Sequence, residues 1–371
     1  MRTRFLLTLL MAGLSVTGYA QSKGPLSVSG ADYKFTPVID LNTTSVKDQA
    51  STGTCWSFAT TSMIESELLR MGKGEYDLSE MFVVRQNYKD KLSDNYQKLG
   101  KGNTSEGSLS HDWFRIFKEF GIVPEEVYDG INYDSQRHDH GELQDVINSI
   151  KKVPLDQNNE SEEYKEIIDA VLDSYLGKLE GSFSYKGSTF TPKSFAASLG
   201  INPDDYVEIT SFTHFPFYSH GVLEVPDNWS MAKLYNVPID ELVEIIDYAF
   251  GKGYTVNWDG DVSERGFSHQ QGIAVIPSEK DPGKEAEITQ EMRQTGFENQ
   301  TTTDDHLMHL TGIAKDQDGK KFYKTKNSWG TGRNRYDGYL YMSESYVRAK
   351  TIFIMVNKDG IPEKIKSKLG L

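Results

Sequence analysis

The chain has 371 residues, with 40 basic and 54 acidic side chains and a formal net charge of −14. Apolar residues make up 37% of the chain and charged residues 25%, a composition that excludes a disordered or fibrous protein. The acidic balance argues against a nucleic-acid partner, because binding to a phosphate backbone requires a surplus of Lys and Arg.

The first residues carry the pattern of an export signal. Arg2 and Arg4 precede a short apolar run over residues 5–16, and the small residues Gly18 and Ala20 occupy the positions that signal peptidase requires. The apolar run is too short to cross a bilayer. We therefore expect a cleaved signal peptide, an exported (periplasmic or extracellular) protein and no stable membrane anchor after cleavage; an uncleaved anchor is the alternative. Removing the two arginines leaves a charge of −16.

Apolar periodicity predicts helices early in the chain and strands in its last third. Helices are expected over residues 56–70, 113–120, 164–175 and 238–250. Strands are expected over residues 254–258, 273–276, 307–314, 321–326, 338–342 and 351–356. The polar stretch 278–305 is interpreted as a surface excursion. This order favours an α+β protein with two lobes and a functional site in the cleft between them.

Cys55, the only cysteine in the chain, precedes the first predicted helix. It cannot form an intrachain disulfide, so it is either a small buried residue beside Trp56 or a reactive thiol. A helix N-terminus lowers the pKa of a thiol and favours the nucleophilic thiolate. Gly53 permits the tight turn that this placement needs, and the Gln49 amide could donate to an oxyanion above the sulfur together with the Cys55 N–H.

Two later motifs could supply the partners of a nucleophilic thiol. His306 stands at the start of a predicted strand, where it could act as a fixed base. Asn327 follows 21 residues later, and its amide oxygen could accept from the imidazole and hold its tautomer. Trp329 could shield that hydrogen bond from water. The joint order Gln, Cys, His, Asn is far more specific than any one of these residues.

These residues together resemble the papain superfamily of cysteine peptidases. Three further stretches support the resemblance: Leu78-Ser79-Glu80, Glu106-Gly107-Ser108 and Tyr336-Asp337-Gly338-Tyr339-Leu340. The resemblance implies a papain-like α+β fold, with a helical lobe that carries the catalytic helix and an antiparallel β lobe. It implies a Cys55, His306 and Asn327 triad with Gln49 in the oxyanion hole. It also implies that Gly107 and Trp329 bind substrate, Gly107 through its backbone.

Within this superfamily, the chain is most similar to the bleomycin hydrolase and aminopeptidase C branch. Cys55 and His306 are 251 positions apart, which implies a large insertion of the kind that this branch has. The stretches 225–229 and 236–239 also resemble it. The branch implies aminopeptidase activity on peptide substrates and a closed homo-hexamer. Thr54 replaces the Arg that usually precedes the nucleophile in this branch, and only 44 residues follow Asn327, so papain-like endopeptidase activity stays open.

The predicted organisation is a signal peptide followed by one peptidase domain. The ranges are 1–20 for the signal peptide and 21–371 for the domain, which divides into a helical lobe with the insertion at about 40–250, a β lobe at about 251–357 and a C-terminal tail at 358–371.

We expect no metal and no other cofactor. His306 and His309 are three apart on a predicted strand, so they point to opposite faces, and a second thiol is lacking. The other histidines considered, His111, His214, His220 and His269, are expected to be structural or exposed.

Two other functions remain as alternatives to a peptidase. A transglutaminase-like acyl transferase also uses Cys and His, but it favours Asp where this chain has Asn327. A catalytically silent binding protein of the same fold is disfavoured, because all four expected residues are present.

Overall fold

The computed structural model describes residues 26–29, 32–281 and 283–371, and the predicted signal peptide lies outside them. Its helices are α1 Cys55–Arg70, α2 Glu80–Gln97, α3 Ser110–Phe120, α4 Gly141–Ile150, α5 Val153–Gln157, α6 Glu162–Leu176, α7 Pro192–Leu199, α8 Ile239–Gly251, α9 Gln290–Glu298, α10 Glu344–Lys350 and α11 Glu363–Leu369, with short 3-10 turns at Pro203–Asp205 and Lys358–Gly360. Its strands are β1 Thr36–Asp40, β2 Phe183–Tyr185, β3 Ser188–Phe190, β4 Tyr206–Thr210, β5 His220–Val222, β6 Lys233–Asn236, β7 Val256–Gly260, β8 Phe267–Ser268, β9 Ile273–Ala274, β10 His306–Lys315, β11 Lys321–Lys326, β12 Tyr339–Ser343 and β13 Thr351–Asn357.

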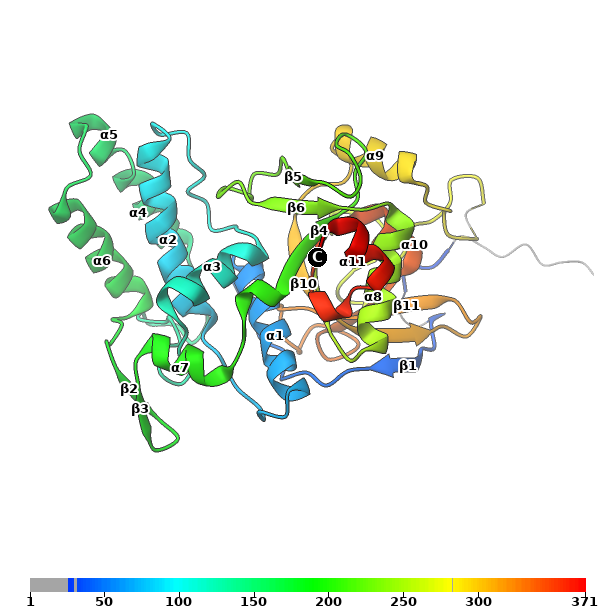
Figure 1. The fold of residues 1–371 in the computed structure, drawn as a ribbon, viewed down its shortest axis with the longest axis horizontal. Coiled ribbons are helices and arrows are strands. Elements are labelled where there is room, and N and C mark those ends of the chain that lie inside the picture. The colour runs from blue at the N-terminus through cyan, green and yellow to red at the C-terminus, as the bar shows by residue number, and fades with distance from the viewer. Residues whose placement is uncertain (1–25, 30–31, 282) are drawn as a thin grey trace, which may run out of the picture.

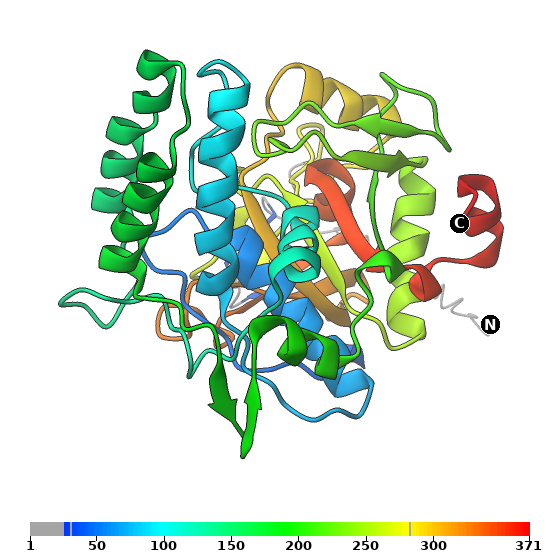
Figure 2. The same cartoon turned by 60° about the vertical axis from the view of Figure 1, so that its left-hand side comes forward.

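The molecule has a helical end and a sheet end, as the α+β prediction required (Figure 1). Helices α2, α4, α5 and α6 form the helical end. Within the described residues, the main sheet has the order β5-β6-β4-β13-β7-β10-β11-β12-β9-β8, with β1 paired to β10. Most neighbouring strands are antiparallel, and β10 pairs with β7 so that Leu307 lies opposite Asp259. Helix α1 lies between the two ends (Figure 2).

Helix α1 is buried along almost its whole length, from Cys55 to Leu68. It packs on β10 and β7 on one side and on α2 and α3 on the other. Its small hydroxyl residues permit this close packing because they hydrogen-bond within the core: Thr60 donates to the Trp56 carbonyl at 2.7 Å, and Ser57 donates to the Glu80 carbonyl at 2.8 Å. The first residue of α1 is thereby fixed against the sheet.

The four predicted helices and six predicted strands are all present, with ends shifted by a few residues. The interpretation of residues 278–305 as a surface excursion was wrong in part, because α9 lies within them. Arg293 of α9 is buried and donates to the Ser211 carbonyl at 2.7 Å. A polar helix can therefore pack into the protein when its polar groups are hydrogen-bonded.

The division into two lobes stays a prediction. Strands β4, β5 and β6 belong to the main sheet, and α8 packs on the same apolar core. The sheet therefore takes up part of the range that the sequence assigned to the helical lobe.

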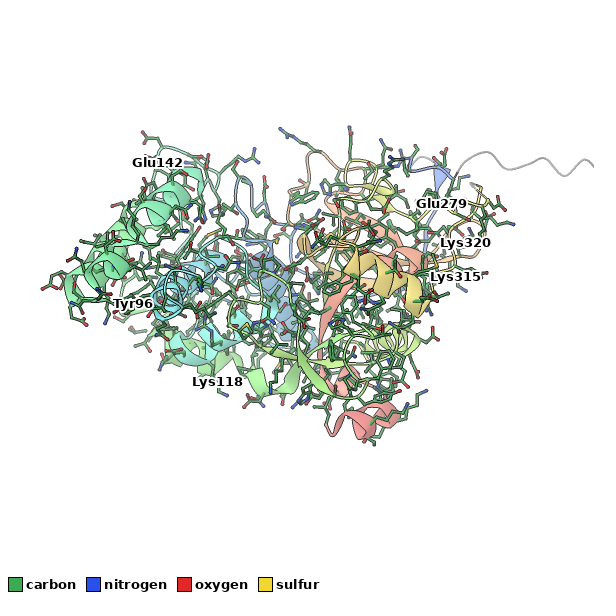
Figure 3. The ribbon with its side chains drawn as sticks, turned by 90° about the horizontal axis from the view of Figure 1, so that it is seen from above. Tyr96, Lys118, Glu142, Glu279, Lys315 and Lys320 are labelled. Atoms are coloured by element: carbon green, nitrogen blue, oxygen red, sulfur yellow. The ribbon has the colours of Figure 1, made fainter. Side chains whose placement is uncertain are left out.

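The C-terminal residues pack beside α8, at the sheet end (Figure 2). Ile361, Ile365 and Leu369 are buried in the core that α8 shares, and Lys368 pairs with Glu241. Seen from above, Lys315 and Lys320 mark the sheet end of the molecule, and Tyr96 and Glu142 mark the helical end (Figure 3). Within the described ranges, we find no helix that combines the length and the apolarity needed to cross a bilayer.

Candidate active site

Cys55 is the first residue of α1, and the loop before it is held by Glu106. The Gly53 N–H donates to Glu106 Oε2 at 2.7 Å, and Trp56 Nε1 donates to the Glu106 carbonyl at 3.1 Å. Only 9% of Cys55 is exposed. The segment that precedes the nucleophile is therefore fixed by a residue about 50 positions away, which sequence reasoning had singled out only as a neighbour of Gly107.

His306 is the first residue of β10 and is hydrogen-bonded to Asn327. The distance between His306 Nε2 and Asn327 Oδ1 is 2.7 Å. The Trp329 ring lies 4.6 Å from the His306 ring, centroid to centroid. The geometry agrees with the prediction that Trp329 shields this hydrogen bond from water.

Asn327 is itself oriented by two further groups. Its oxygen accepts from the Ser328 N–H at 2.7 Å, and its Nδ2 donates to His269 Nδ1 at 3.1 Å. His269 also lies against the Trp329 ring. We expected a structural or exposed role for His269, but it belongs to this site, because the short β8–β9 pairing brings residues 267–274 beside β12.

Gln49 reaches the site through the segment that pairs with Trp329. Its N–H donates to the Ser328 carbonyl at 2.8 Å, and its Oε1 accepts from Ser328 Oγ at 2.7 Å. Gln49 Nε2 donates to the Thr52 carbonyl at 2.7 Å. Because an amide nitrogen carries two hydrogens, one remains for a ligand above Cys55.

The residues singled out from the sequence converge on one open pocket of about 730 Å³. Cys55, His306, Gln49, Gly107 and Trp329 all line it. Asn327 stands behind His306 as its hydrogen-bond partner. The fold thus brings a thiol and an imidazole that are 251 positions apart into the same cleft.

Gly107 lies in a tight part of this pocket. Its carbonyl accepts from Lys91 Nζ, and Lys91 is also bonded to the Ser105 carbonyl at 2.8 Å. A methyl group at Gly107 would overlap the carboxylate of Asp227. Sequence reasoning missed Lys91 and the placement of Asp227, because neither lies near Gly107 in the chain.

Burial disfavours the charged form of both the Cys55 thiol and the His306 imidazole. Burial raises the pKa of the Cys55 thiol to about 12, although a hydrogen bond with the backbone N–H of Leu307 lowers it. Burial lowers the pKa of His306 to about 4, although the hydrogen bond to Asn327 raises it. The prediction that the helix N-terminus lowers the thiol pKa was therefore wrong, because desolvation outweighs the helix dipole.

The other histidines do not enter the pocket. His309 is buried on the opposite face of β10 from His306, as strand alternation predicted, and its Nδ1 lies 2.9 Å from Ser62 Oγ. His111 contacts Glu208, and His214 contacts Glu224. In the part of the chain that the structure describes, no three His, Cys, Asp or Glu side chains are placed to hold a metal ion.

Comparison with known proteins defines the class of this fold and site. Residues 38–250 match the Papain family cysteine protease family, and residues 181–370 match the Peptidase C1-like family. Each match covers more than half of the chain, which therefore belongs to the papain superfamily of cysteine peptidases. Within that superfamily it is similar to proteins named aminopeptidase C.

These relatives are distant, but the matches cover nearly the whole chain. Aminopeptidase C from Lactobacillus helveticus is 22% identical over 378 residues, covering 88% of this chain and 82% of its own length. Aminopeptidase C from Lactobacillus delbrueckii subsp. lactis is 20% identical over 386 residues, covering 91% and 85%. The crystal structure of PepW from Lactobacillus rhamnosis HN001 is similar in fold, with a TM-score of 0.72, 19% identity and coverage of 90% and 84%.

Proposed function

We propose that this cysteine peptidase cleaves peptide bonds through Cys55, His306 and Asn327, with Gln49 and the Cys55 N–H as oxyanion donors. The observation that carries the proposal is the shielded His306–Asn327 hydrogen bond in the pocket that Cys55 lines. Asn327 accepts from His306 Nε2, so Nε2 carries the proton and Nδ1 is left as the base.

The reaction proceeds in two stages, acylation and deacylation of Cys55, and His306 moves protons in both. His306 Nδ1 takes the thiol proton as the Cys55 sulfur attacks the substrate carbonyl, and Gln49 donates to the oxyanion that forms. The C–N bond then breaks as His306 returns the proton to the leaving amine, which leaves a thioester on Cys55. Water attacks the thioester with His306 as base, which releases the carboxylic acid and restores the thiol.

The names of the relatives support a proposal for the substrate class. Both curated relatives are named aminopeptidase C, which supports removal of residues from the N-terminus of peptides. In the structure, residues 358–371 pack beside α8, and the residues that line the pocket come from elsewhere in the described chain.

The decisive test compares the wild type with Cys55→Ala on fluorogenic peptide amides. We expect the wild type to release the fluorophore and the variant to show no turnover while its melting temperature is unchanged. A variant that retains turnover would refute the proposal. Comparing a free-amine substrate with its N-acetylated form separates aminopeptidase from endopeptidase activity.

We also propose export of the chain, based on the sequence of residues 1–20 alone. N-terminal sequencing of the protein secreted by its host should begin at Gln21. A protein that retains the first twenty residues would contradict this. A homo-hexamer stays a prediction from family resemblance, to be tested by sedimentation.

A further inference from the structure

Glu106 links the loop before Cys55 to the wall of the cleft that contains Gly107. Its carboxylate Oε2 accepts from the Gly53 N–H at 2.7 Å, and its carbonyl accepts from Trp56 Nε1 at 3.1 Å. Gly107 is the next residue in the chain, and Glu106 itself lines the pocket. One residue therefore contacts the segments on both sides of the nucleophile.

The carboxylate of Glu106 is itself held in position. Its side chain is only 17% exposed, and His140 Nδ1 lies 3.5 Å from Oε2. His140 is fully buried, and the Tyr88 hydroxyl lies 3.3 Å from the same ring nitrogen. The contact with Gly53 is also close, because a methyl group added there would lie 3.1 Å from Glu106 Cβ. The acceptor that faces the Gly53 N–H therefore has little freedom to move.

The loop before Cys55 is held at a second point, by backbone hydrogen bonds. The Ser51 N–H donates to the His138 carbonyl at 3.1 Å, and the Ser51 carbonyl accepts from the His140 N–H at 3.2 Å. This anchor lies four residues before the nucleophile, whereas the bond to Glu106 lies two residues before it. A substitution of Glu106 therefore removes the nearer anchor and leaves the further one intact.

The direction of the Cys55 N–H depends on the conformation of this loop. Cys55 is the first residue of α1, and the first N–H groups of a helix have no acceptor within it. The peptide that carries this N–H joins Thr54 to Cys55, and the Thr54 side chain does not cap the helix. The residue before it is Gly53, which is conformationally permissive. The bond from Gly53 to Glu106 therefore restricts the backbone that orients the oxyanion donor.

We propose that Glu106 is a positioning residue of the oxyanion hole, which holds the backbone of residues 53–55 so that the Cys55 N–H points at the developing oxyanion. This inference rests on the proposed peptidase function. Glu106 acts through the backbone, so it needs an acceptor oxygen at the position of Oε2 and not a negative charge. Preorganised donors lower the barrier because they require no rearrangement as the oxyanion forms. Loss of the anchor therefore weakens the stabilisation of the oxyanion and leaves the thiol in place.

Two substitutions of similar length test the need for an acceptor. Glu106→Gln keeps an oxygen that accepts from the Gly53 N–H, whereas Glu106→Met lacks the acceptor. We expect Glu106→Met to lower kcat on a fluorogenic peptide amide by about 10- to 100-fold, less than the roughly 10²- to 10³-fold loss that follows removal of an oxyanion donor. KM should stay unchanged, and Glu106→Gln should retain most of the activity.

Two reactions of Cys55 separate the oxyanion hole from the site as a whole. The thiol adds across the C=O bond of an aldehyde: an S–C bond forms, the thiol proton passes through His306 to the oxygen, and no group leaves. Because that oxygen lies in the oxyanion hole, Glu106→Met should raise the Kd of the aldehyde by the same factor by which it lowers kcat. Iodoacetamide alkylates the sulfur and releases iodide and the thiol proton without forming an oxyanion, so its rate should stay unchanged.

The probes are leucinal and N-acetyl-leucyl-leucinal, and the one that binds the wild type more tightly is used for the variants. The chain has one cysteine, so the alkylation rate reports on Cys55 alone. Gln49→Ala is the reference for a lost oxyanion donor and should show weaker aldehyde binding with unchanged alkylation. Glu142→Ala removes an exposed carboxylate at the helical end and should match the wild type in both reactions (Figure 3).

Three results would overturn this role of Glu106. The first is a Glu106→Met protein that matches the wild type in kcat and in aldehyde affinity. The second is an equal loss in aldehyde affinity and in alkylation rate, which indicates support of the site as a whole. The third is a loss in Glu106→Gln as large as in Glu106→Met, which indicates that the negative charge is required.

Two further measurements keep these outcomes distinct. Glu106→Ala removes the same acceptor with less bulk and is measured beside Glu106→Met, and melting temperatures show that each variant folds. A wild type that neither hydrolyses peptide amides nor binds either aldehyde refutes the proposed function. A wild type that does both, while Glu106→Met and Glu106→Ala equal it, refutes the role of Glu106 alone.

Discussion

The two walls of the cleft are formed by different kinds of side chain. On one wall, which we call the partnered wall, Asn327 accepts from His306 and donates to His269, and Trp329 covers both imidazoles. On the other, charged groups surround Gly107: Lys91 Nζ donates to its carbonyl, and the Asp227 carboxylate lies against its Cα. The comparison teaches that neutral hydrogen-bonded groups hold the imidazole in one tautomer, whereas charged groups hold the glycine segment of the cleft in place.

The largest effect is expected when the partnered wall loses His306, the base beside the thiol. His306→Ala removes the base that takes the proton from Cys55, and we expect kcat to fall by at least roughly 10⁴-fold, as for removal of a triad member. His309→Ala is the matched control, because His309 lies on the opposite face of β10. Kinetics on a fluorogenic peptide amide measure both, and equal losses in the two variants would contradict the assignment of the base.

Gly107→Ala tests the contact between the cleft wall and Asp227. The added methyl group would overlap the Asp227 carboxylate, so we expect kcat/KM to fall by about 10²-fold, as misplacement of a binding element does. Gly181→Ala is the control, since an added methyl group there meets nothing within 4 Å. Unchanged kinetics for Gly107→Ala would show that this wall does not contact substrate.

His269→Ala tests whether His269 helps to hold the Asn327 amide on the partnered wall. Loss of the group that accepts from Asn327 Nδ2 should loosen the amide and lower kcat by about tenfold, with KM unchanged, in the range of outer-shell hydrogen bonds. His269→Gln, whose amide oxygen can accept the same hydrogen bond, should recover part of the loss. An increase in KM alone would instead indicate that His269 contacts substrate.

The smallest effect is expected in the dependence of kcat/KM on pH, on the acidic side of its maximum. Burial lowers the pKa of His306 to about 4, so the imidazole stays neutral and active well below pH 6.5. With a free-amine substrate, whose α-ammonium group stays charged below pH 6.5, kcat/KM at pH 5.5 should remain near its maximum, whereas an ordinary imidazole would leave roughly a tenth. A half-maximal point near pH 6.5 would contradict this environment for His306.

Patterns confined to one segment were predictable from the sequence. Residues 321–326 and the helix after Cys55 were predicted from their local composition, and the structure places them close to the predicted bounds. The positions of Cys55, His306 and Asn327 were also predictable, because each lies in a recognisable motif. Helix α2 was missed because its polar residues obscure the apolar spacing, although its Lys91 and Asn95 are buried.

Features that depend on tertiary packing were not predictable. The thiol pKa of Cys55 was expected to fall, but burial raises it, and this burial arises only when the chain folds. The contact between Gly107 and Asp227 joins residues 120 positions apart, and no local pattern relates them. His269 enters the site through strands of two residues each, which are too short to give a periodic signal.

Covalent trapping of the nucleophile tests the central claim most directly. The chain has a single cysteine, so an active-site-directed peptidyl acyloxymethyl ketone can form a thioether at only one thiol. We predict that intact-protein mass spectrometry shows one adduct, that peptide mapping places it on Cys55, and that hydrolysis stops in proportion to labelling. A fully labelled protein that still hydrolyses peptides, or an inactivated protein with an unmodified Cys55, would contradict the account.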